Sequence, residues 1–242
     1  MELDGRTFEL HVGRGDEGSA GPRPLIVAFH GGMATGADMR KLTNLDARAD
    51  REGWVVAYPN GVEGHWNDGR GVDNYPAHRD DVDDVGFVSR LVDHLVETAG
   101  VDRGRVYATG FSNGGMFVHR LAMTRPDLVA AIAPVAGTIA RPLLDPGPQA
   151  PVPVLMIHGT ADRMVAYDGG PVGGPSESRG EVASVEETCA WWRAANRCSD
   201  TAEEETLPHR DDADPTHVRV ARWEPEGADG AEVVVATVVE GG

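Results

Sequence analysis

The feature that most constrains this chain is a five-residue segment, GFSNG, which runs from Gly110 to Gly114 between an apolar run and a helical segment. The apolar run covers residues 105–109, and the segment suited to a helix covers residues 113–124. A serine at the tip of a strained strand-to-helix turn needs small neighbours, because the strand and the helix pass close to each other there. The two glycines meet that need. The pattern predicts that Ser112 is a nucleophile, and an ordinary turn serine is the alternative.

Short apolar runs alternate with longer amphipathic segments along the chain, which is typical of a mainly parallel sheet flanked by helices. Strands are expected at residues 25–29, 54–58, 105–109, 129–135, 152–157, 216–223 and 231–239. Helices are expected around residues 39–51, 83–99, 113–124 and 182–196, and loops at 61–81, 168–180 and 199–214. With the serine turn, this order predicts an α/β-hydrolase fold and a single domain over residues 1–242.

The composition argues against several classes of partner. The formal charge is −17, from 39 acidic and 22 basic residues, so much of the surface would repel nucleic acid and anionic membranes. No apolar run is long enough to span a bilayer, and the first residues lack a signal-peptide pattern, so we expect a soluble chain that is not exported; its compartment is otherwise open. Cys189 and Cys198 would lie too far apart to bridge if both were on one helix, so no disulfide is expected.

Attack by a serine creates a negative oxygen that preorganised backbone N–H groups must stabilise. One expected donor is the N–H of Asn113, directly after the serine. The other is expected in the turn His30-Gly31-Gly32, which follows the strand at residues 25–29; Gly32 is the preferred donor and Gly31 the next. A plain glycine turn that closes the strand is the alternative.

The remaining catalytic groups should follow in the order serine, acid, histidine. Asp162 follows a buried strand and is the expected acid, with a turn-capping aspartate as the alternative. His158 precedes the acid and is expected to be structural. Only His209 and His217 follow Asp162, and His217 is a weak substitute for the base. The last strand runs to the end of the sequence, so we expect this chain to stop before its general base.

Six ordered motifs resemble the polyhydroxybutyrate depolymerase and feruloyl esterase family. They are residues 24–32 (PLIVAFHGG), 65–70 (HWNDGR), 83–87 (DDVGF), 105–115 (RVYATGFSNGG), 133–137 (APVAG) and 155–162 (LMIHGTAD). The resemblance implies that Ser112 is the nucleophile and Asp162 the triad acid. In the family the histidine stands in a Gly-His-x-Trp-Pro-Gly motif after a strand that ends in Glu-Gly-Gly, and this chain ends at Glu240-Gly241-Gly242. A truncated fragment is therefore expected. Family members often pair a cysteine that matches Cys198 with one before the last strand, which is lacking in this sequence.

These observations predict a serine carboxylic ester hydrolase without cofactor or metal. Its substrate would be a small-molecule or polymeric ester: a polyester oligomer such as polyhydroxybutyrate, or a feruloyl or short acyl ester. Trp66 and His30 are expected to contact the substrate, although Trp66 could instead pack its loop. The acidic residues at 80–84 are expected to cap a helix rather than to hold a cation. A non-catalytic binding protein and a peptidase or thioesterase of the same fold are the alternatives, and the oligomeric state is open.

Overall fold

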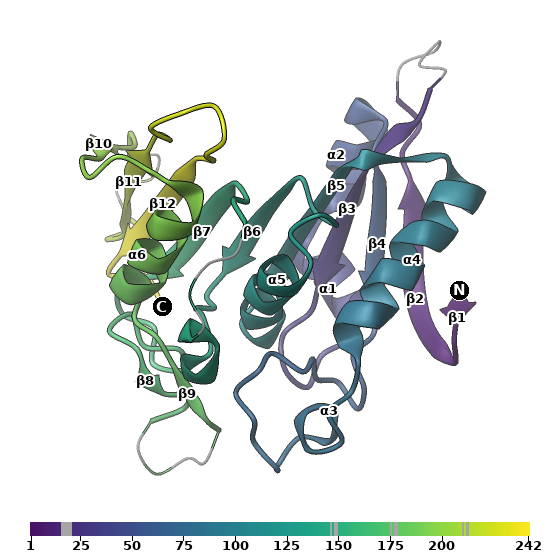
Figure 1. The fold of residues 1–242 in the computed structure, drawn as a ribbon, viewed down its shortest axis with the longest axis horizontal. Coiled ribbons are helices and arrows are strands. Elements are labelled where there is room, and N and C mark those ends of the chain that lie inside the picture. Colours follow the sequence, from purple (N-terminus) through teal and green to yellow (C-terminus); the bar gives the residue numbers. More distant parts are fainter. Residues whose placement is uncertain are drawn as a thin grey trace.

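The computed structural model describes residues 1–15, 21–145, 147, 150–174, 176, 179–209, 211 and 213–242. Its main feature is a ten-stranded sheet (Figure 1). In spatial order the strands are β1 (Glu2–Leu3), β2 (Arg6–Val12), β4 (Val55–Pro59), β3 (Arg23–Phe29), β5 (Val101–Phe111), β6 (Ala131–Val135), β7 (Val154–Gly159), β12 (Val233–Val239), β11 (His217–Trp223) and β10 (Glu203–Thr206). A separate short pair joins β8 (Gly170–Pro171) to β9 (Glu181–Val182).

The six central strands, from β4 to β12, pair in parallel, and the strands at both margins pair antiparallel. This arrangement confirms the predicted α/β-hydrolase architecture with a mainly parallel core. Parallel strands place their carboxyl ends at one edge of the sheet, where the ligands of such folds bind. The loops that carry β8, β9 and the short helix α3 (Pro76–Arg79) hang from this edge, at the bottom of Figure 1.

Helices cover both faces of the sheet. They are α1 (Gly36–Thr43), α2 (Leu45–Glu52), α4 (Asp84–Ala99), α5 (Asn113–Thr124) and α6 (Val185–Asn196), with a 3₁₀ turn at Arg141–Leu144. Alternate residues of a strand point to opposite faces: Val55 and Ala57 of β4 join the large core with α4, α5 and α6, whereas Val56 and Tyr58 pack with α1 and α2. No helix in the described ranges is long and apolar enough to cross a membrane.

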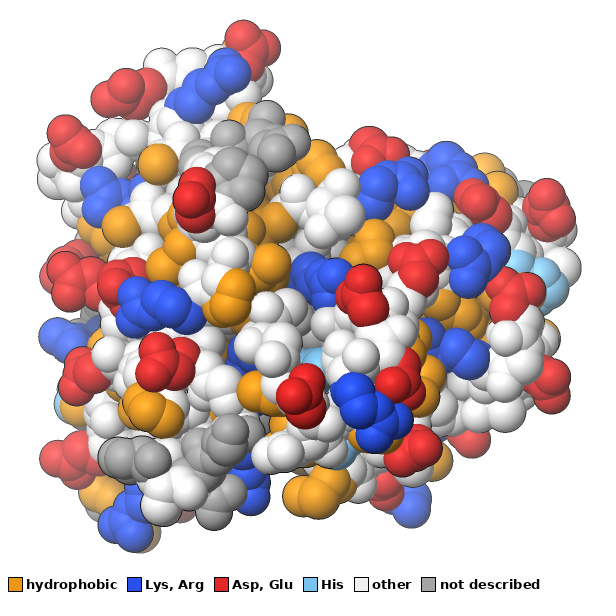
Figure 2. Space-filling view, turned by 60° about the horizontal axis from the view of Figure 1, so that its bottom comes forward, with side chains coloured by type: hydrophobic (Ala, Val, Ile, Leu, Met, Phe, Trp, Pro, Cys, Tyr) orange, Lys and Arg blue, Asp and Glu red, His pale blue; other side chains and the backbone are white. Residues whose placement is uncertain are grey.

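The space-filling view of the loop edge shows acidic and basic side chains intermixed rather than gathered in one acidic patch (Figure 2). The strong negative charge of the sequence is thus not concentrated on this face. Both cysteines are free thiols, and Cys189 is buried.

Several predictions about secondary structure need correction. The loop expected at 168–180 contains β8, and the helix expected at 182–196 begins only at Val185, after β9. The helix expected at 39–51 is two helices, broken at Asn44, which adopts the left-handed conformation with φ 49°. The acidic segment 199–214, expected to be a loop, contains strand β10, whose four side chains are all exposed. It is an edge strand held by backbone pairing to β11, so its sequence shows no alternation of apolar and polar residues. The loop expected at 61–81 contains α3. Residues 175, 177, 178, 210 and 212 of the expected loops lie outside the described residues.

Candidate active site

Ser112 lies between the end of β5 and the start of α5, at the carboxyl edge of the sheet. Its backbone has φ 54° and ψ −119°, a conformation that is strained for a residue with a side chain. Two hydrogen bonds hold it: its N–H donates to the carbonyl of Val135 in β6 at 2.9 Å, and its carbonyl accepts from the N–H of Met116 at 2.9 Å. The serine turn expected from the sequence is therefore present in the fold.

The glycines around this turn are needed because backbone passes directly beside them. A Cβ at Gly110 would overlap the carbonyl of Gly114, and a Cβ at Gly114 would overlap the carbonyls of Phe29 and His30 in the neighbouring chain segment. A Cβ at Gly137 would lie 2.6 Å from the carbonyl oxygen of Ser112. The strand, the turn and the helix therefore fit together only with these side chains absent.

The turn His30-Gly31-Gly32 packs against the serine turn. A Cβ at Gly31 would lie 3.6 Å from the Cβ of Ser112, and a Cβ at Gly32 would lie 3.9 Å from that of Asn113. The backbone N–H groups of Gly32 and Asn113 donate to no acceptor among the described residues. Two unpaired donors beside a serine are what an oxyanion hole requires.

The side chain of Asn113 is fixed by three hydrogen bonds. Its Oδ1 accepts from the N–H of Trp66 at 2.9 Å, and its Nδ2 donates to the carbonyl of Trp66 at 3.0 Å. The same Nδ2 donates to the carboxylate of Asp68 at 2.6 Å. Asn113 is thus bonded to the segment 65–70. The sequence shows this segment as the HWNDGR motif but does not indicate its contact with Asn113.

Asp162 lies in the turn after β7. Its Oδ1 accepts the N–H groups of Met164 at 2.8 Å and Val165 at 2.9 Å, so the carboxylate also forms the turn that the sequence offered as an alternative. Its Oδ2 lies 3.6 Å from Nε2 of His158. That nitrogen donates to the carbonyl of Val165 at 2.7 Å, which gives His158 the structural place expected for it.

Ser112 and Asp162 line the same cavity, which has a volume of about 400 Å³. Apolar side chains form much of its wall: Phe111, Val135, Ala136, Ile157, Met164, Val165 and Val238. Gly241 and Gly242 line it as well, and the carbonyl of Gly241 accepts the N–H of Ala161 at 2.8 Å. The structure therefore brings together the predicted nucleophile and the predicted acid.

The histidines after Asp162 lie elsewhere. His217 begins β11 opposite Val239, four strand pairings from β5, which corresponds to about 19 Å across the sheet. His209 is exposed, and its ring bonds to the carbonyl of Thr216 at 2.6 Å. Of the histidines in the described part of the chain, His158 alone lines the cavity.

Trp66 and His30, the expected substrate contacts, are both buried in the structure. Trp66 is 0% exposed and packs between Phe29 and Phe117, with ring centroids 5.0 and 5.3 Å away. Its Nε1 donates to the carbonyl of His30 at 3.1 Å. Nε2 of His30 accepts the N–H of Gly61 at 2.9 Å, and burial lowers the pKa of His30, in keeping with a neutral ring. The two residues support the glycine turn from behind.

Two acidic residues at the start of α4 serve the helix and the fold. Asp83 caps α4 by accepting the N–H of Gly86 at 2.8 Å. Asp84 is buried and pairs with Arg6 at 2.6 Å. No cluster of His, Cys, Asp and Glu side chains suited to a metal ion is found within the described ranges.

Comparison with known proteins places these features in a wider group. Residues 17–171 match the family described as phospholipase/carboxylesterase. NocK of Nocardia uniformis subsp. tsuyamanensis, which carries an esterase name, is 33% identical over 98% of this chain and 69% of its own length. Feruloyl esterase B of Piromyces equi is 32% identical over 61% of this chain, and the match covers only 27% of that protein.

Two solved structures share the fold. Acetyl xylan esterase from Aspergillus awamori superimposes with a TM-score of 0.62 at 16% identity, over 96% of this chain and 88% of that one. The poly(3-hydroxybutyrate) depolymerase LpqC from Bordetella parapertussis gives a TM-score of 0.54 at 23% identity, over 79% of this chain and 73% of that one. At these identities the likeness is one of fold.

Proposed function

The chain belongs to the phospholipase/carboxylesterase family and is a serine carboxylic ester hydrolase, and on that premise we propose that Ser112 is its nucleophile and Asp162 its triad acid. One observation carries the assignment: a serine with a strained, positive φ shares a cavity with a partly buried carboxylate and adjoins two unpaired N–H groups. Backbone strain has a cost, and it persists where the surrounding structure holds it for function.

The chemistry follows from this arrangement. Oγ of Ser112 attacks the ester carbonyl carbon, and the N–H groups of Asn113 and Gly32, with Gly31 next in line, hold the resulting oxyanion. The alcohol then leaves with a proton, and water releases the acyl group from Ser112 in a second step. Asp162 holds one oxygen in its turn, which leaves Oδ2 to orient a base.

The base must receive the Ser112 proton inside the cavity, between Oγ and Oδ2 of Asp162. His158 does not fit this role, because its Nε2 is bonded to the carbonyl of Val165. His217 does not fit it either, because it lies about four strand spacings away from β5. An imidazole placed in the cavity could accept the serine proton on one nitrogen and donate to Asp162 from the other.

Hydrolysis of p-nitrophenyl acetate with added imidazole tests the assignment. The rate of Ser112→Ala is subtracted from that of the wild type to correct for hydrolysis by imidazole in solution. The remaining rate should rise with imidazole concentration. Equal hydrolysis rates in the wild type and in Ser112→Ala would contradict the assignment of Ser112 as the nucleophile. Robust activity without imidazole that is lost in His217→Ala would assign the base to His217 instead.

The substrate is proposed more finely as a polyester oligomer, such as one of hydroxybutyrate, or a feruloyl or short acyl ester. The names of the relatives support this range, and the apolar wall formed by Phe111, Met164 and Val165 suits an uncharged acyl group. Turnover of methyl ferulate, hydroxybutyrate trimer and p-nitrophenyl acetate, each measured with added imidazole, should separate the three. A preference for a matched amide or thioester would favour a peptidase or thioesterase, and no turnover of any of them would favour a binding protein.

A further inference from the structure

A cluster of buried charged side chains adjoins Asn113. Asp68 is fully buried, and the side chains of Arg70 and His78 are 3% and 0% exposed. Nε and Nη2 of Arg70 donate to Oδ2 of Asp68 at 3.0 and 2.8 Å, and Nε also reaches Oδ1 at 3.1 Å. Oδ2 also accepts the Asn113 bond at 2.6 Å. The carboxylate therefore joins an arginine to the residue that follows Ser112.

The cluster is anchored on other segments of the chain. Nη1 of Arg70 donates to the carbonyl of Arg179 at 2.7 Å. Nε2 of His78 donates to the carbonyl of Trp66 at 2.9 Å and lies 3.5 Å from Asp68, while Nδ1 accepts the N–H of Val72 at 3.4 Å. Burial lowers the pKa of His78, so the ring is a neutral donor and Arg70 supplies the positive charge.

A buried ion pair is poor evidence of a stability gain, because desolvating two charges costs about as much as their attraction returns. In some proteins such a pair instead fixes the geometry of the groups around it. Here the fixed group is the side-chain amide of Asn113. The backbone N–H of the same residue is one of the two unpaired donors beside Ser112. An oxyanion hole works only if its donors are aimed before the charge develops.

We infer that Asp68, held by Arg70, is a positioning residue for the oxyanion hole and acts through the side chain of Asn113. The inference rests on the proposed function, because it assigns Asn113 the role of an oxyanion donor. It predicts that loss of the Asp68 carboxylate slows the attack of Ser112 on a fluorophosphonate, in which the O–P bond forms as fluoride leaves, and does not change binding of the reagent.

The test measures the rate at which an alkyl fluorophosphonate labels Ser112 in the presence of imidazole, as a function of reagent concentration. Asp68→Asn should lower the maximal labelling rate on the order of ten- to a hundredfold, with little change in the half-saturating concentration. This decrease is smaller than the one caused by removing an oxyanion donor altogether. Asn113→Ala, which keeps the backbone N–H but removes the side chain, should have a similar effect. The double variant should be no slower than Asn113→Ala, because Asp68 acts through that side chain.

Asp84→Asn is the matched control. Asp84 is also a buried carboxylate paired with an arginine, and it accepts a backbone N–H, that of Asn67, at 2.7 Å, but it does not contact Asn113. It should lose stability without a change in the maximal labelling rate. If Asp68→Asn does not fold, Arg70→Lys retains the charge without the two-pronged contact and should give a smaller decrease in rate.

Unchanged labelling in Asp68→Asn or, where that variant does not fold, in Arg70→Lys would overturn the inference. The inference would also be overturned if the rate decreases of Asp68→Asn and Asn113→Ala multiplied in the double variant. The two residues would then have independent structural roles. A wild type that is not labelled at Ser112 at all would instead overturn the proposed function, which keeps the two failures distinguishable.

Discussion

The two halves of the candidate site are held in different ways. The serine half depends on contacts between distant segments: Ser112 bonds to Val135 in β6, and Asn113 bonds to Trp66 and Asp68, at least 45 residues earlier in the chain. The acid half is local, because Asp162 is held by N–H groups only two and three residues ahead of it. A change in the serine half should therefore disturb several elements, whereas a change in the acid half should stay within its turn.

Gly114→Ala should give the largest loss of stability. The added Cβ would overlap the carbonyls of Phe29 and His30, which are backbone groups of β3 and its turn and cannot move independently. We expect the free energy of unfolding, measured with urea, to fall by about 3 kcal/mol or more. Gly104→Ala is the control within β5, because its Cβ would meet only a side-chain oxygen of Asp102 at 3.4 Å. Similar free energies of unfolding for the two variants would contradict the claim that the serine half depends on close contacts between distant segments.

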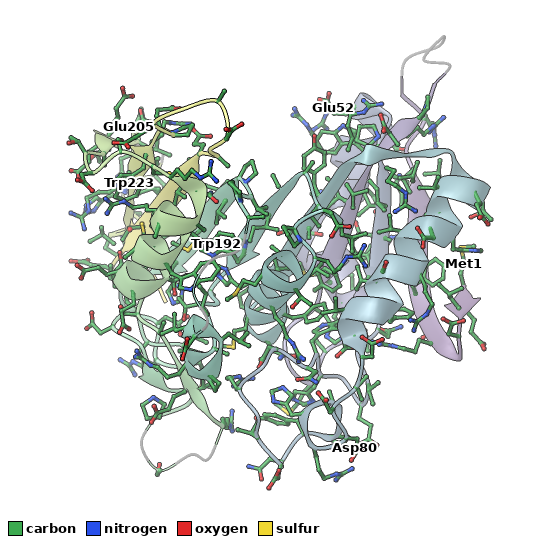
Figure 3. All side chains as sticks on the ribbon, viewed as in Figure 1. Met1, Glu52, Asp80, Trp192, Glu205 and Trp223 are labelled. Atoms are coloured by element: carbon green, nitrogen blue, oxygen red, sulfur yellow. The ribbon has the colours of Figure 1, made fainter. Side chains whose placement is uncertain are left out.

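Acid should weaken the packing behind the serine half through His119 in α5. Its Nδ1 accepts from Nε1 of Trp192 at 2.9 Å, and Nε2 faces the carbonyl of Gly137 at 3.3 Å, so the ring is neutral. Trp192 lies on α6 (Figure 3). Burial lowers the pKa of His119 from 6.5 to about 3. Between these values the unfolded chain binds a proton that the folded chain does not, so stability falls as the pH falls.

The expected loss through this residue is about 1 kcal/mol between pH 6.5 and 5.5 and approaches about 1.4 kcal/mol for each pH unit below that. Urea unfolding at pH 6.5 and 5.5 should show a steeper loss for the wild type than for His119→Gln. Identical slopes in wild type and His119→Gln would contradict a neutral, buried His119.

Asp162→Asn should have the smallest effect on stability. The amide oxygen can still accept the N–H groups of Met164 and Val165, so the free energy of unfolding should change by less than about 1 kcal/mol. Imidazole-dependent hydrolysis through Ser112 should nevertheless decrease, because the charge that orients the base is lost. A loss of stability as large as that of Gly114→Ala would show that the acid half is not local.

The sequence predicted best what is encoded locally. The helix at 113–124 matches α5 because GFSNG, an apolar strand and an amphipathic segment are adjacent in the chain. The cavity shared by Ser112 and Asp162 follows from the rule that parallel strands end at one edge of the sheet. The burial of Trp66 could not be predicted, because it depends on how an aperiodic loop packs against Phe29 and Phe117. The Asp68–Arg70–His78 cluster could not be predicted either, because it forms within the same aperiodic loop. Strand β10 was missed for another reason: it is held by backbone pairing to β11, which leaves no pattern in its side chains.

Peptide mapping of the fluorophosphonate adduct formed with added imidazole tests the central claim most directly. The account predicts one adduct per chain, located on Ser112, absent in Ser112→Ala and still formed, more slowly, in Asp162→Asn. An adduct on another residue, or equal labelling of Ser112→Ala and wild type, would contradict the claim that Ser112 is the nucleophile of a preorganised serine half.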